Sequence, residues 1–419
     1  MKEQFLQYVW KHRLLPPAPL RTTQGAAVEI LDPGLWNHDA GPDFFNAKLK
    51  IGGELWVGNV EVHVRASDWQ LHGHQRDAAY ANVILHAVAE ADAEIALPSG
   101  RTLPQLVLSV PPDVEARFDS LMAEEAYPPC HRIIPTLAPI EVRAWLSALT
   151  VERLEQKTRR ISHRLGLTGG HWEQTFFITL ARAMGFGVNS DTFEQWAATI
   201  DLGSVGKHRD HPEQVGAYFL GTAGLLDRFA PAQREKWATP AETAAWEREW
   251  HFLRSKFGLK PIDGSQWRYL RLRPQNFPHV RLLQLARAFH EGQLTLSSLL
   301  EADSPQAIRQ IFHAALPQLQ AASLDLLLIN AASPTLFAHG QSHADDRQCD
   351  RAFALLESLK AERNHITRSW EKAGLAVDNA ADSQALIQLR TRYCDRKDCL
   401  RCRFGTQFLA SRTPTTTTP

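Results

Sequence analysis

The sequence lacks the hydrophobic stretches that mark secreted and membrane proteins. Its first ten residues, MKEQFLQYVW, contain charged side chains and no apolar segment that leads to a small-residue cleavage site. No run approaches the roughly 20 apolar residues of a membrane-spanning helix. We therefore expect a cytoplasmic protein that does not associate with membranes.

Cysteine is scarce, with five residues in a chain of 419, and the odd number does not fit a complete disulfide framework. Cys394, Cys399 and Cys402 lie within nine residues of one another, a spacing suited to Zn²⁺ or an iron–sulfur cluster. The candidates for a fourth ligand, in order of preference, are Cys130, His131 and Cys349. The alternative is that the cysteines stay reduced and bind no metal, as a reducing compartment permits.

The sequence also lacks an excess of charge of either sign, because 46 basic residues balance 46 acidic ones. The balance is uneven along the chain. Residues 1–150 contain 12 Lys and Arg against 18 Asp and Glu, and the remainder contains 34 against 28. The excess of acidic residues in 1–150 suits a cation site, and the excess of basic residues in the remainder suits contact with nucleic acid. Solvated helical faces would give the same split.

The chain is long for a single hydrophobic core, and its patterning changes near residue 113 from strand-like alternation to helical periodicity. We predict an α+β or α/β domain with a mixed sheet at about 1–112, an all-α domain at about 113–412 and a disordered tail at 413–419. The predicted strands cover 26–31, 43–51, 55–64, 82–88 and 105–110. The predicted helices include 2–12, 142–165, 172–184, 243–257, 279–290, 304–315 and 350–360.

Carboxylates and a histidine occupy neighbouring predicted strands. Asp43 begins one strand, and after a Gly-Gly turn the next strand places Glu61 and His63 on one face and Val60 and Val62 on the other. Adjacent strands lie about 4.8 Å apart, so Asp43 and Glu61 could share a hard cation through their oxygen atoms. Without a cation the two carboxylates would repel each other.

The order of opening helix, strand, Pro42-Asp43 and Glu61-x-His63 resembles the core of the PD-(D/E)XK nucleases. The resemblance implies that Glu3, Asp43, Glu61 and His63 are catalytic. It also implies that Asp43, Glu61 and the backbone carbonyl of Val62 bind Mg²⁺ or Mn²⁺, and that the reaction is hydrolysis of phosphodiester bonds in nucleic acid. A distant cysteine with a C-terminal trio is likewise similar to the clusters that join the ends of some of these nucleases.

The sequence departs from this nuclease pattern at His63, where the family has lysine. Histidine can be neutral at pH 7, act as a base or bind a transition metal, whereas lysine supplies a fixed positive charge. The alternative function is therefore a non-catalytic scaffold that binds nucleic acid or protein and retains a degenerate nuclease fold.

Further candidate ligands follow the same strand. His72, His74 and Asp77 lie in a polar segment that could form a second metal site or a phosphate clamp, or simply a polar loop. His86 lies within an apolar strand, which favours a hydrogen-bonded core histidine.

A basic segment with aromatic residues lies in the predicted helical domain. Arg268, Arg271 and Arg273 could contact the phosphates of a nucleic acid. A packed helix that begins near Asn276-Phe277-Pro278 would explain the same pattern.

The whole chain also resembles the bacterial domain-of-unknown-function family 2851, which implies no assigned activity. The matching segments are residues 37–44, 67–69, 271–278 and 393–402.

Overall fold

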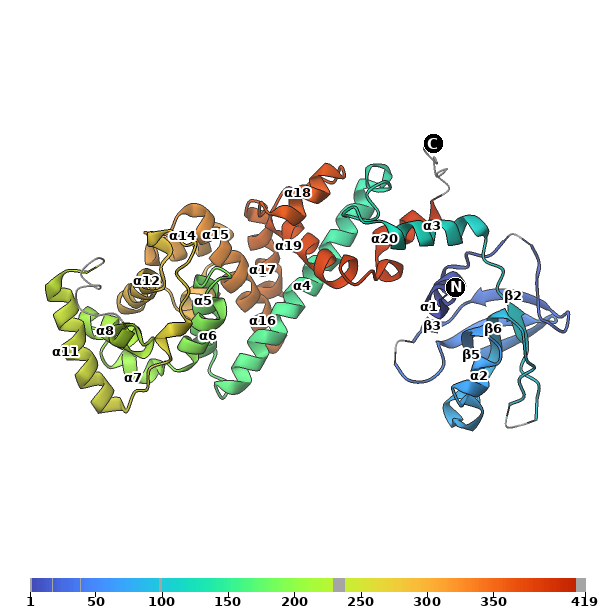
Figure 1. The fold of residues 1–419 in the computed structure, drawn as a ribbon, viewed down its shortest axis with the longest axis horizontal. Coiled ribbons are helices and arrows are strands. Elements are labelled where there is room, and N and C mark those ends of the chain that lie inside the picture. Colours follow the sequence, from blue (N-terminus) through green and yellow to red (C-terminus); the bar gives the residue numbers. More distant parts are fainter. Residues whose placement is uncertain (1, 17, 38, 98–99, 229–237, 412–419) are drawn as a thin grey trace. The chain divides into compact units, whose positions relative to one another are not determined.

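The computed structural model describes residues 2–16, 18–37, 39–97, 100–228 and 238–411, and the predicted tail at 413–419 lies outside them. The chain divides into two compact units (Figure 1). The sheet unit comprises residues 1–137 and 391–419, and the helical unit comprises residues 138–390. The expected mixed sheet and helical region are both present.

The sheet unit contains a mixed seven-stranded sheet in the order β1-β2-β4-β5-β6-β7, with β3 beside β4. The pairs from β1 to β5 are antiparallel, whereas β5–β6 and β6–β7 are parallel. The bounds are β1 (Leu20–Arg21), β2 (Ala27–Asp32), β3 (Leu35–Trp36), β4 (Phe44–Ile51), β5 (Glu54–Arg65), β6 (Val83–Glu90) and β7 (Gln105–Val107).

The hairpin between β4 and β5 was predicted from its turn. Gly52 and Gly53 both have positive φ, 62° and 90°, as a tight two-residue hairpin turn requires. The pairing of Ile51 with Glu54 sets the register of β5. That register decides which face of the strand meets the core.

The opening helix α1 (Glu3–His12) packs against β5. Leu6 and Trp10 of α1 share a core with Val60 and Val62, which are fully buried. The predicted alternation is therefore confirmed, since the valines of β5 join this core and the polar residues between them face the other way.

A return segment links β5 to its parallel neighbour β6. It contains α2 (Asp68–Leu71), η1 (His74–Arg76) and η2 (Ala78–Tyr80). Trp69 and Tyr80 anchor it in a second small core that includes Val83. Two parallel neighbouring strands need such a crossover, because the chain must return to the same end of the sheet before the second strand begins.

The sheet unit extends beyond the predicted boundary at residue 112. It includes α3 (Pro112–Ala123), η3 (Ile134–Thr136), η8 (Cys399–Arg401) and α20 (Arg403–Ala410). Phe118 of α3 stacks on Phe5 with ring centroids 4.4 Å apart, and Arg117 Nε donates to the carbonyl of Leu409 at 3.1 Å. These contacts bind both α3 and the C-terminal segment to the sheet unit, whereas the sequence pattern assigned them to the helical domain.

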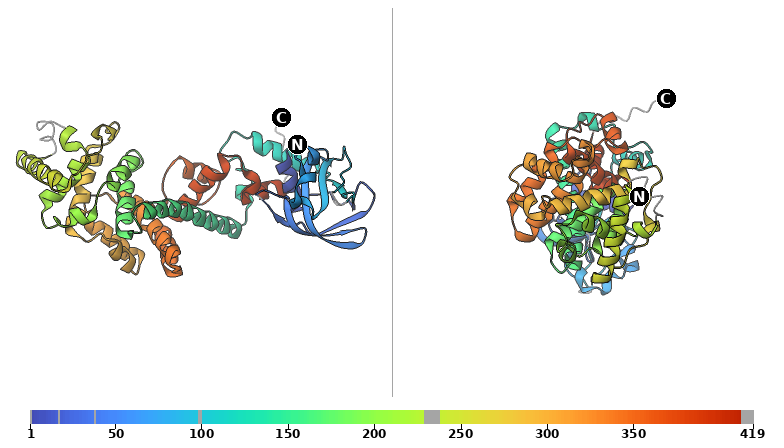
Figure 2. Two further views of the ribbon diagram at one scale, coloured as in Figure 1. Left: turned by 90° about the horizontal axis from the view of Figure 1, so that it is seen from below. Right: turned by 90° about the vertical axis from the view of Figure 1, so that its left-hand side faces the viewer.

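The helical unit has its own large apolar core. Figure 2 shows its longest helix, α4, in teal, and α4 packs on α16 and α19. Six of the seven predicted helices lie in this unit and correspond to α4, α5, α11, α12, α14 and α17, and the seventh, at 2–12, corresponds to α1. The bounds are α4 (Pro139–Leu167), α5 (Trp172–Met184), α6 (Ser190–Ala198), α7 (Leu202–Gly206), α8 (Pro212–Thr222), α9 (Leu225–Arg228), α11 (Pro240–Phe257), η4 (Gly264–Gln266), η5 (Pro274–Asn276), α12 (Pro278–Glu291), α13 (Leu296–Glu301), α14 (Pro305–Ala315), α15 (Ala321–Leu327), η6 (Leu328–Ala332), α16 (Ser333–His343), α17 (Asp346–Ser358), α18 (His365–Lys372) and α19 (Ala380–Leu389). The π-helical turn η7 (Arg390–Cys394) begins at the last residue of this unit and continues into the C-terminal segment of the sheet unit.

One continuous helical stretch, Ala321–His343, is long and apolar enough to cross a membrane by length and composition. Within its most apolar window, 67% is buried inside the protein, as in the core helix of a globular fold. A π-helical turn, η6, interrupts it at Leu328–Ala332.

Candidate carboxylate and histidine site

Asp43 and Glu61 meet where β4 begins beside β5. The backbone N–H of Asp43 donates to Glu61 Oε2 at 3.0 Å, and the backbone N–H of Val62 donates to Asp43 Oδ2 at 3.0 Å. Gln7 Nε2 on α1 donates to Asp43 Oδ1 at 2.8 Å. The structure therefore brings the two predicted carboxylates together and fixes each with hydrogen bonds. Val62 contributes its N–H here, and the role of its carbonyl as a ligand stays a prediction.

The electrostatics of this pair favour a bound cation. Burial raises the pKa of Asp43 above its usual range, and the charge of Glu3 adds to the effect. Burial followed by the charge of Asp43 likewise raises the pKa of Glu61. Like charges in a poorly solvated place oppose ionisation, and a divalent cation would remove that opposition.

Three histidines lie together beside this pair, and two of them contact Glu61. The ligand nitrogens of His63, His72 and His74 all lie within 4.8 Å of one another. Glu61 Oε1 is 3.5 Å from His63 Nε2 and 3.3 Å from His74 Nε2. Glu61 thus faces Asp43 with one oxygen and the imidazoles with the other.

His63 lies in the middle of a chain of imidazoles. Its Nδ1 is 2.8 Å from His86 Nε2, and its Nε2 is 3.2 Å from His72 Nδ1. Burial followed by the charges of His86, His74 and His72 lowers the pKa of His63 to about 2. Burial lowers the pKa of His86 to about 4 and also that of His74. Neutral imidazoles result, and neutral nitrogen is the form that binds metals.

The return segment positions the added histidines. Gly73 adopts a positive φ of 78°, which turns the chain between α2 and η1. His74 then stacks on Tyr80 with centroids 3.9 Å apart. Asp77, a predicted ligand, instead caps η2 by accepting from the N–H of Ala79 at 2.9 Å.

The opening helix supplies two more polar groups. Glu3 and Gln7 are four residues apart and so share a face of α1. Burial raises the pKa of the half-buried Glu3, and the nearby His72 opposes that shift. Sequence reasoning selected Glu3 and missed Gln7, although the four-residue spacing was available as a signal.

These residues fit a divalent cation. Asp43 and Glu61 offer carboxylate oxygens, and the three converging histidines offer nitrogens. His74 Nε2 is buried without a hydrogen-bond partner among the described residues, although Glu61 Oε1 lies 3.3 Å away. A metal ion would satisfy this atom and balance the adjacent acids.

The cysteines form a separate cluster within the sheet unit. Cys130, Cys399 and Cys402 are buried, and Cys394 is partly exposed. Burial followed by the charges of the other three raises the pKa of Cys130, which places all four sulfurs in electrostatic reach of one another. Cys349, a predicted alternative ligand, lies in the helical unit on α17. His131 follows Cys130, and its Nδ1 lies 3.2 Å from the carbonyl of Pro128.

The predicted nucleic-acid arginines lie in the helical unit. Arg271 and Arg273 are exposed and line a pocket of about 240 Å³ together with the buried Arg281. Arg268 does not line that pocket, and its backbone pairs with the side chain of Asn189. Asn276 and Phe277 directly precede α12, so the helix start suggested by this motif is confirmed.

The chain belongs to a family described as a protein of unknown function, DUF2851, which matches residues 3–319 and 314–365. The matched residues include the carboxylate and histidine site and end before the C-terminal cysteines. No curated protein and no solved structure matches the chain.

Proposed function

We propose that the sheet unit is a divalent-metal-dependent hydrolase of phosphodiester bonds in nucleic acid. The observation that carries this proposal is the position of Glu61. Its carboxylate contacts the Asp43 backbone at 3.0 Å and lies within 3.5 Å of two histidine nitrogens. Carboxylates and neutral imidazoles therefore converge on one small volume.

Each residue of the site has a distinct role in the proposed hydrolysis. Asp43 and Glu61 would hold the cation, and the backbone and Gln7 hydrogen bonds keep the Asp43 oxygens in place. When bound, a divalent cation would supply positive charge to the phosphate and lower the pKa of a water molecule. His63 is kept neutral by its surroundings, and a neutral imidazole can donate a lone pair to the cation.

The donor set favours a particular kind of metal. Imidazole nitrogens bind Mn²⁺, Zn²⁺ and other first-row ions better than Mg²⁺, which prefers oxygen ligands. With three histidines beside the carboxylates, we infer that Mn²⁺ or Zn²⁺ supports turnover better than Mg²⁺.

Two observations support a nucleic-acid substrate. The order of helix, Pro42-Asp43 and Glu61-x-His63 resembles PD-(D/E)XK nucleases, whose substrates are phosphodiesters. The helical unit also carries exposed arginines such as Arg271 and Arg273. Arginine binds phosphate groups through paired hydrogen bonds.

The test is a screen of the full chain against DNA and RNA, single- and double-stranded, with Mg²⁺, Mn²⁺ and Zn²⁺. Asp43→Ala and Glu61→Gln should both be inactive. Glu54→Gln is a matched control, because Glu54 is exposed at the far end of the same strand. Inactivity of the wild type toward every substrate with every ion would overturn the enzyme proposal and favour a binding scaffold.

A further inference from the structure

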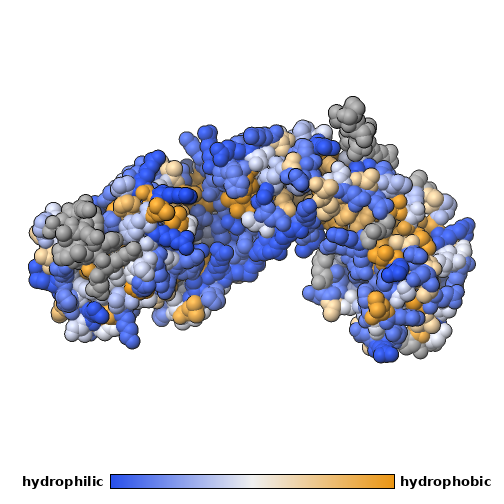
Figure 3. Space-filling view, in the orientation of Figure 1, coloured by the Kyte–Doolittle hydropathy of each residue, from blue (hydrophilic) through white to orange (hydrophobic). Residues whose placement is uncertain are grey.

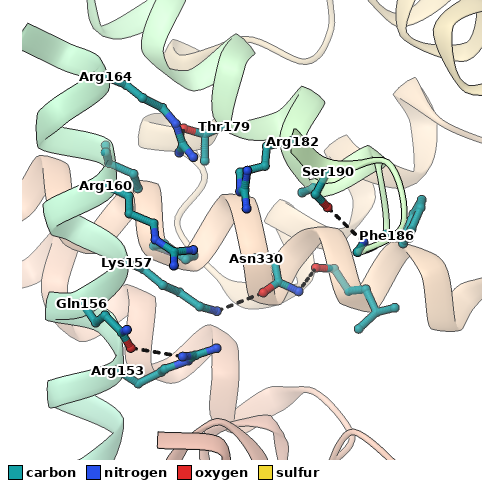
Figure 4. A pocket seen from close by; sticks show the side chains of 15 residues that line it. Arg153, Gln156, Lys157, Arg160, Arg164, Thr179, Arg182, Phe186, Ser190 and Asn330 are labelled. Carbon is teal, nitrogen blue, oxygen red and sulfur yellow. Dashed lines mark hydrogen bonds between the residues drawn. The ribbon is translucent and has the colours of Figure 1, made fainter. Parts of the chain in front are cut away.

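A pocket of about 360 Å³ in the helical unit is lined by basic side chains (Figure 4). Helix α4 contributes four of them, Arg153, Lys157, Arg160 and Arg164, and α5 contributes Arg182. The residues that line this pocket include no carboxylate. Its charge is therefore opposite to that of the site in the sheet unit.

The sequence builds this basic wall by helical spacing. The four residues of α4 are separated by four, three and four positions, which places them on one face of the helix. Figure 4 shows Lys157 and Arg160 directed into the pocket, and Figure 3 shows hydrophilic residues, in blue, along this part of the unit. The spacing of these basic residues in the sequence already indicates a basic face on this helix.

Carboxylates neutralise only part of this charge. Glu194 binds both Arg164 and Arg182, and Asp191 binds Arg182 at 2.6 Å. Arg160 forms no hydrogen bond or salt bridge with any residue that the structure describes. Lys157 Nζ donates to two neutral oxygen atoms, one of Ile329 and one of Asn330. The pocket thus keeps positive charge without a matching acid.

Neutral polar groups complete the lining. Lys157 Nζ donates to the carbonyl of Ile329 and to Asn330 Oδ1, both at 3.1 Å, and both residues lie in the π-helical turn η6. Turns of this type are frequent at functional sites. Ser190 Oγ accepts from the N–H of Gly187 at 2.9 Å, so its own proton is available to a ligand.

The environment of Lys157 is unfavourable for its own charge. Burial, together with the charges of Arg153 and Arg160, lowers the pKa of Lys157 to about 7, and Glu362 opposes the shift only in part. A positive group that loses hydration beside other cations is stabilised by a bound anion.

We propose that this pocket binds the phosphate group of a nucleotide-sized ligand. Its volume lies within the range of about 300–1,000 Å³ that small-ligand sites occupy, and it exceeds what a bare phosphate needs. Phe186 also lines it and offers an aromatic surface beside the basic groups.

Two kinds of ligand carry such a phosphate group. One is a free nucleotide, and the other is the phosphorylated end of a nucleic-acid strand. The proposal does not rest on hydrolysis in the sheet unit, because it concerns binding by residues of the helical unit alone.

The test is calorimetric titration of the full chain with pyrophosphate, a mononucleotide and a short oligonucleotide with or without a 5′-phosphate. A chelator is present throughout, so that metal in the sheet unit does not contribute. Tight binding of the mononucleotide identifies a free nucleotide. Binding of the oligonucleotide that depends on its 5′-phosphate identifies a strand end.

The matched variants are Arg160→Gln and Arg159→Gln. Both residues are exposed on α4, but only Arg160 lines the pocket. We expect Arg160→Gln to weaken binding by about tenfold or more, since a hydrogen bond to a charged group is lost. Lys157→Met should weaken it similarly, and Arg159→Gln should not change it. Thermal melting checks that each variant is folded.

Two results would overturn the proposal. One is that none of the phosphate probes binds the wild-type chain at millimolar concentration. The other is that Arg159→Gln weakens binding as much as Arg160→Gln, which would show a diffuse charge effect without a defined site.

Discussion

Each of the two units gathers charged side chains of one sign. The sign is negative in the sheet unit and positive in the helical unit. In the sheet unit, burial raises the pKa of Asp43 and Glu61, so their negative forms are disfavoured. In the helical unit, burial lowers the pKa of Lys157, so its positive form is disfavoured. Each arrangement is costly without a partner and becomes favourable with an ion of the opposite charge.

Some charged groups are neutralised by a partner within the protein, whereas others would be neutralised by a bound ion. Arg164 and Glu194 in the helical unit pair at 2.5 Å and need no further partner. Asp43 and Glu61 have no cationic side chain within salt-bridge distance among the described residues other than His63 and His74, whose pKa values are lowered. Groups of this kind lower the stability of the empty protein and serve binding instead.

The largest expected effect is on the carboxylate side. Glu61→Gln should reduce metal-dependent hydrolysis by about 10⁴-fold, corresponding to about 5 kcal/mol of activation free energy. The reason is that Glu61 contacts both the backbone of Asp43 and the histidines. Initial rates with Mn²⁺ measure the effect. Retention of more than a tenth of the wild-type rate would show that the chemistry lies elsewhere.

His63 tests whether imidazole is required. His63→Lys should lower the rate by about 10²–10⁴-fold if proton transfer is its role, because the lysine would be protonated beside Glu61. A gain of activity in His63→Lys would instead identify a degenerate nuclease that lacks its lysine.

The cysteines test whether the two units are stabilised independently. Cys399→Ser should destabilise the sheet unit by about 3 kcal/mol, since loss of a structural metal ligand is among the large single effects. Phosphate binding by the helical unit should be unchanged. Elemental analysis of protein purified without oxygen should find zinc or iron. Absence of both metals, with unchanged melting of Cys399→Ser, would contradict a cysteine-bound metal.

A smaller effect concerns pH. The raised pKa values of Asp43 and Glu61 mean that the empty sheet unit loses stability as pH rises above the usual carboxyl range. Stabilisation by Mn²⁺ should therefore be greater at pH 8.5 than at pH 6.5, by on the order of 1 kcal/mol. Melting curves measure it, and an equal Mn²⁺ effect at both pH values would contradict it.

Much of the sheet unit was predictable from local pattern. The alternation of Val60 and Val62 with Glu61 and His63 defined the two faces of β5, and the Gly-Gly turn fixed its pairing with β4. Both signals act within a few residues of the strand. The proximity of Asp43 to Glu61 followed from them.

The convergence of His72 and His74 on His63 was not predictable in the same way. It depends on the return segment folding back over β5, which is set by Trp69 and Tyr80 in a small separate core. The parallel pairing of β5 with β6, which places His86 against His63, likewise depends on contacts across 23 positions. The unit boundary was missed for a similar reason, since α3 and α20 meet through residues nearly 300 positions apart.

We propose that Glu61 joins the carboxylates and histidines into one cation site. Calorimetric titration of the metal-free full chain with Mn²⁺ tests it most directly, with Glu61→Gln and Glu54→Gln measured beside the wild type. We expect saturable Mn²⁺ binding in the wild type and in Glu54→Gln, and we expect Glu61→Gln to lose it. Equal Mn²⁺ binding by all three proteins would contradict it.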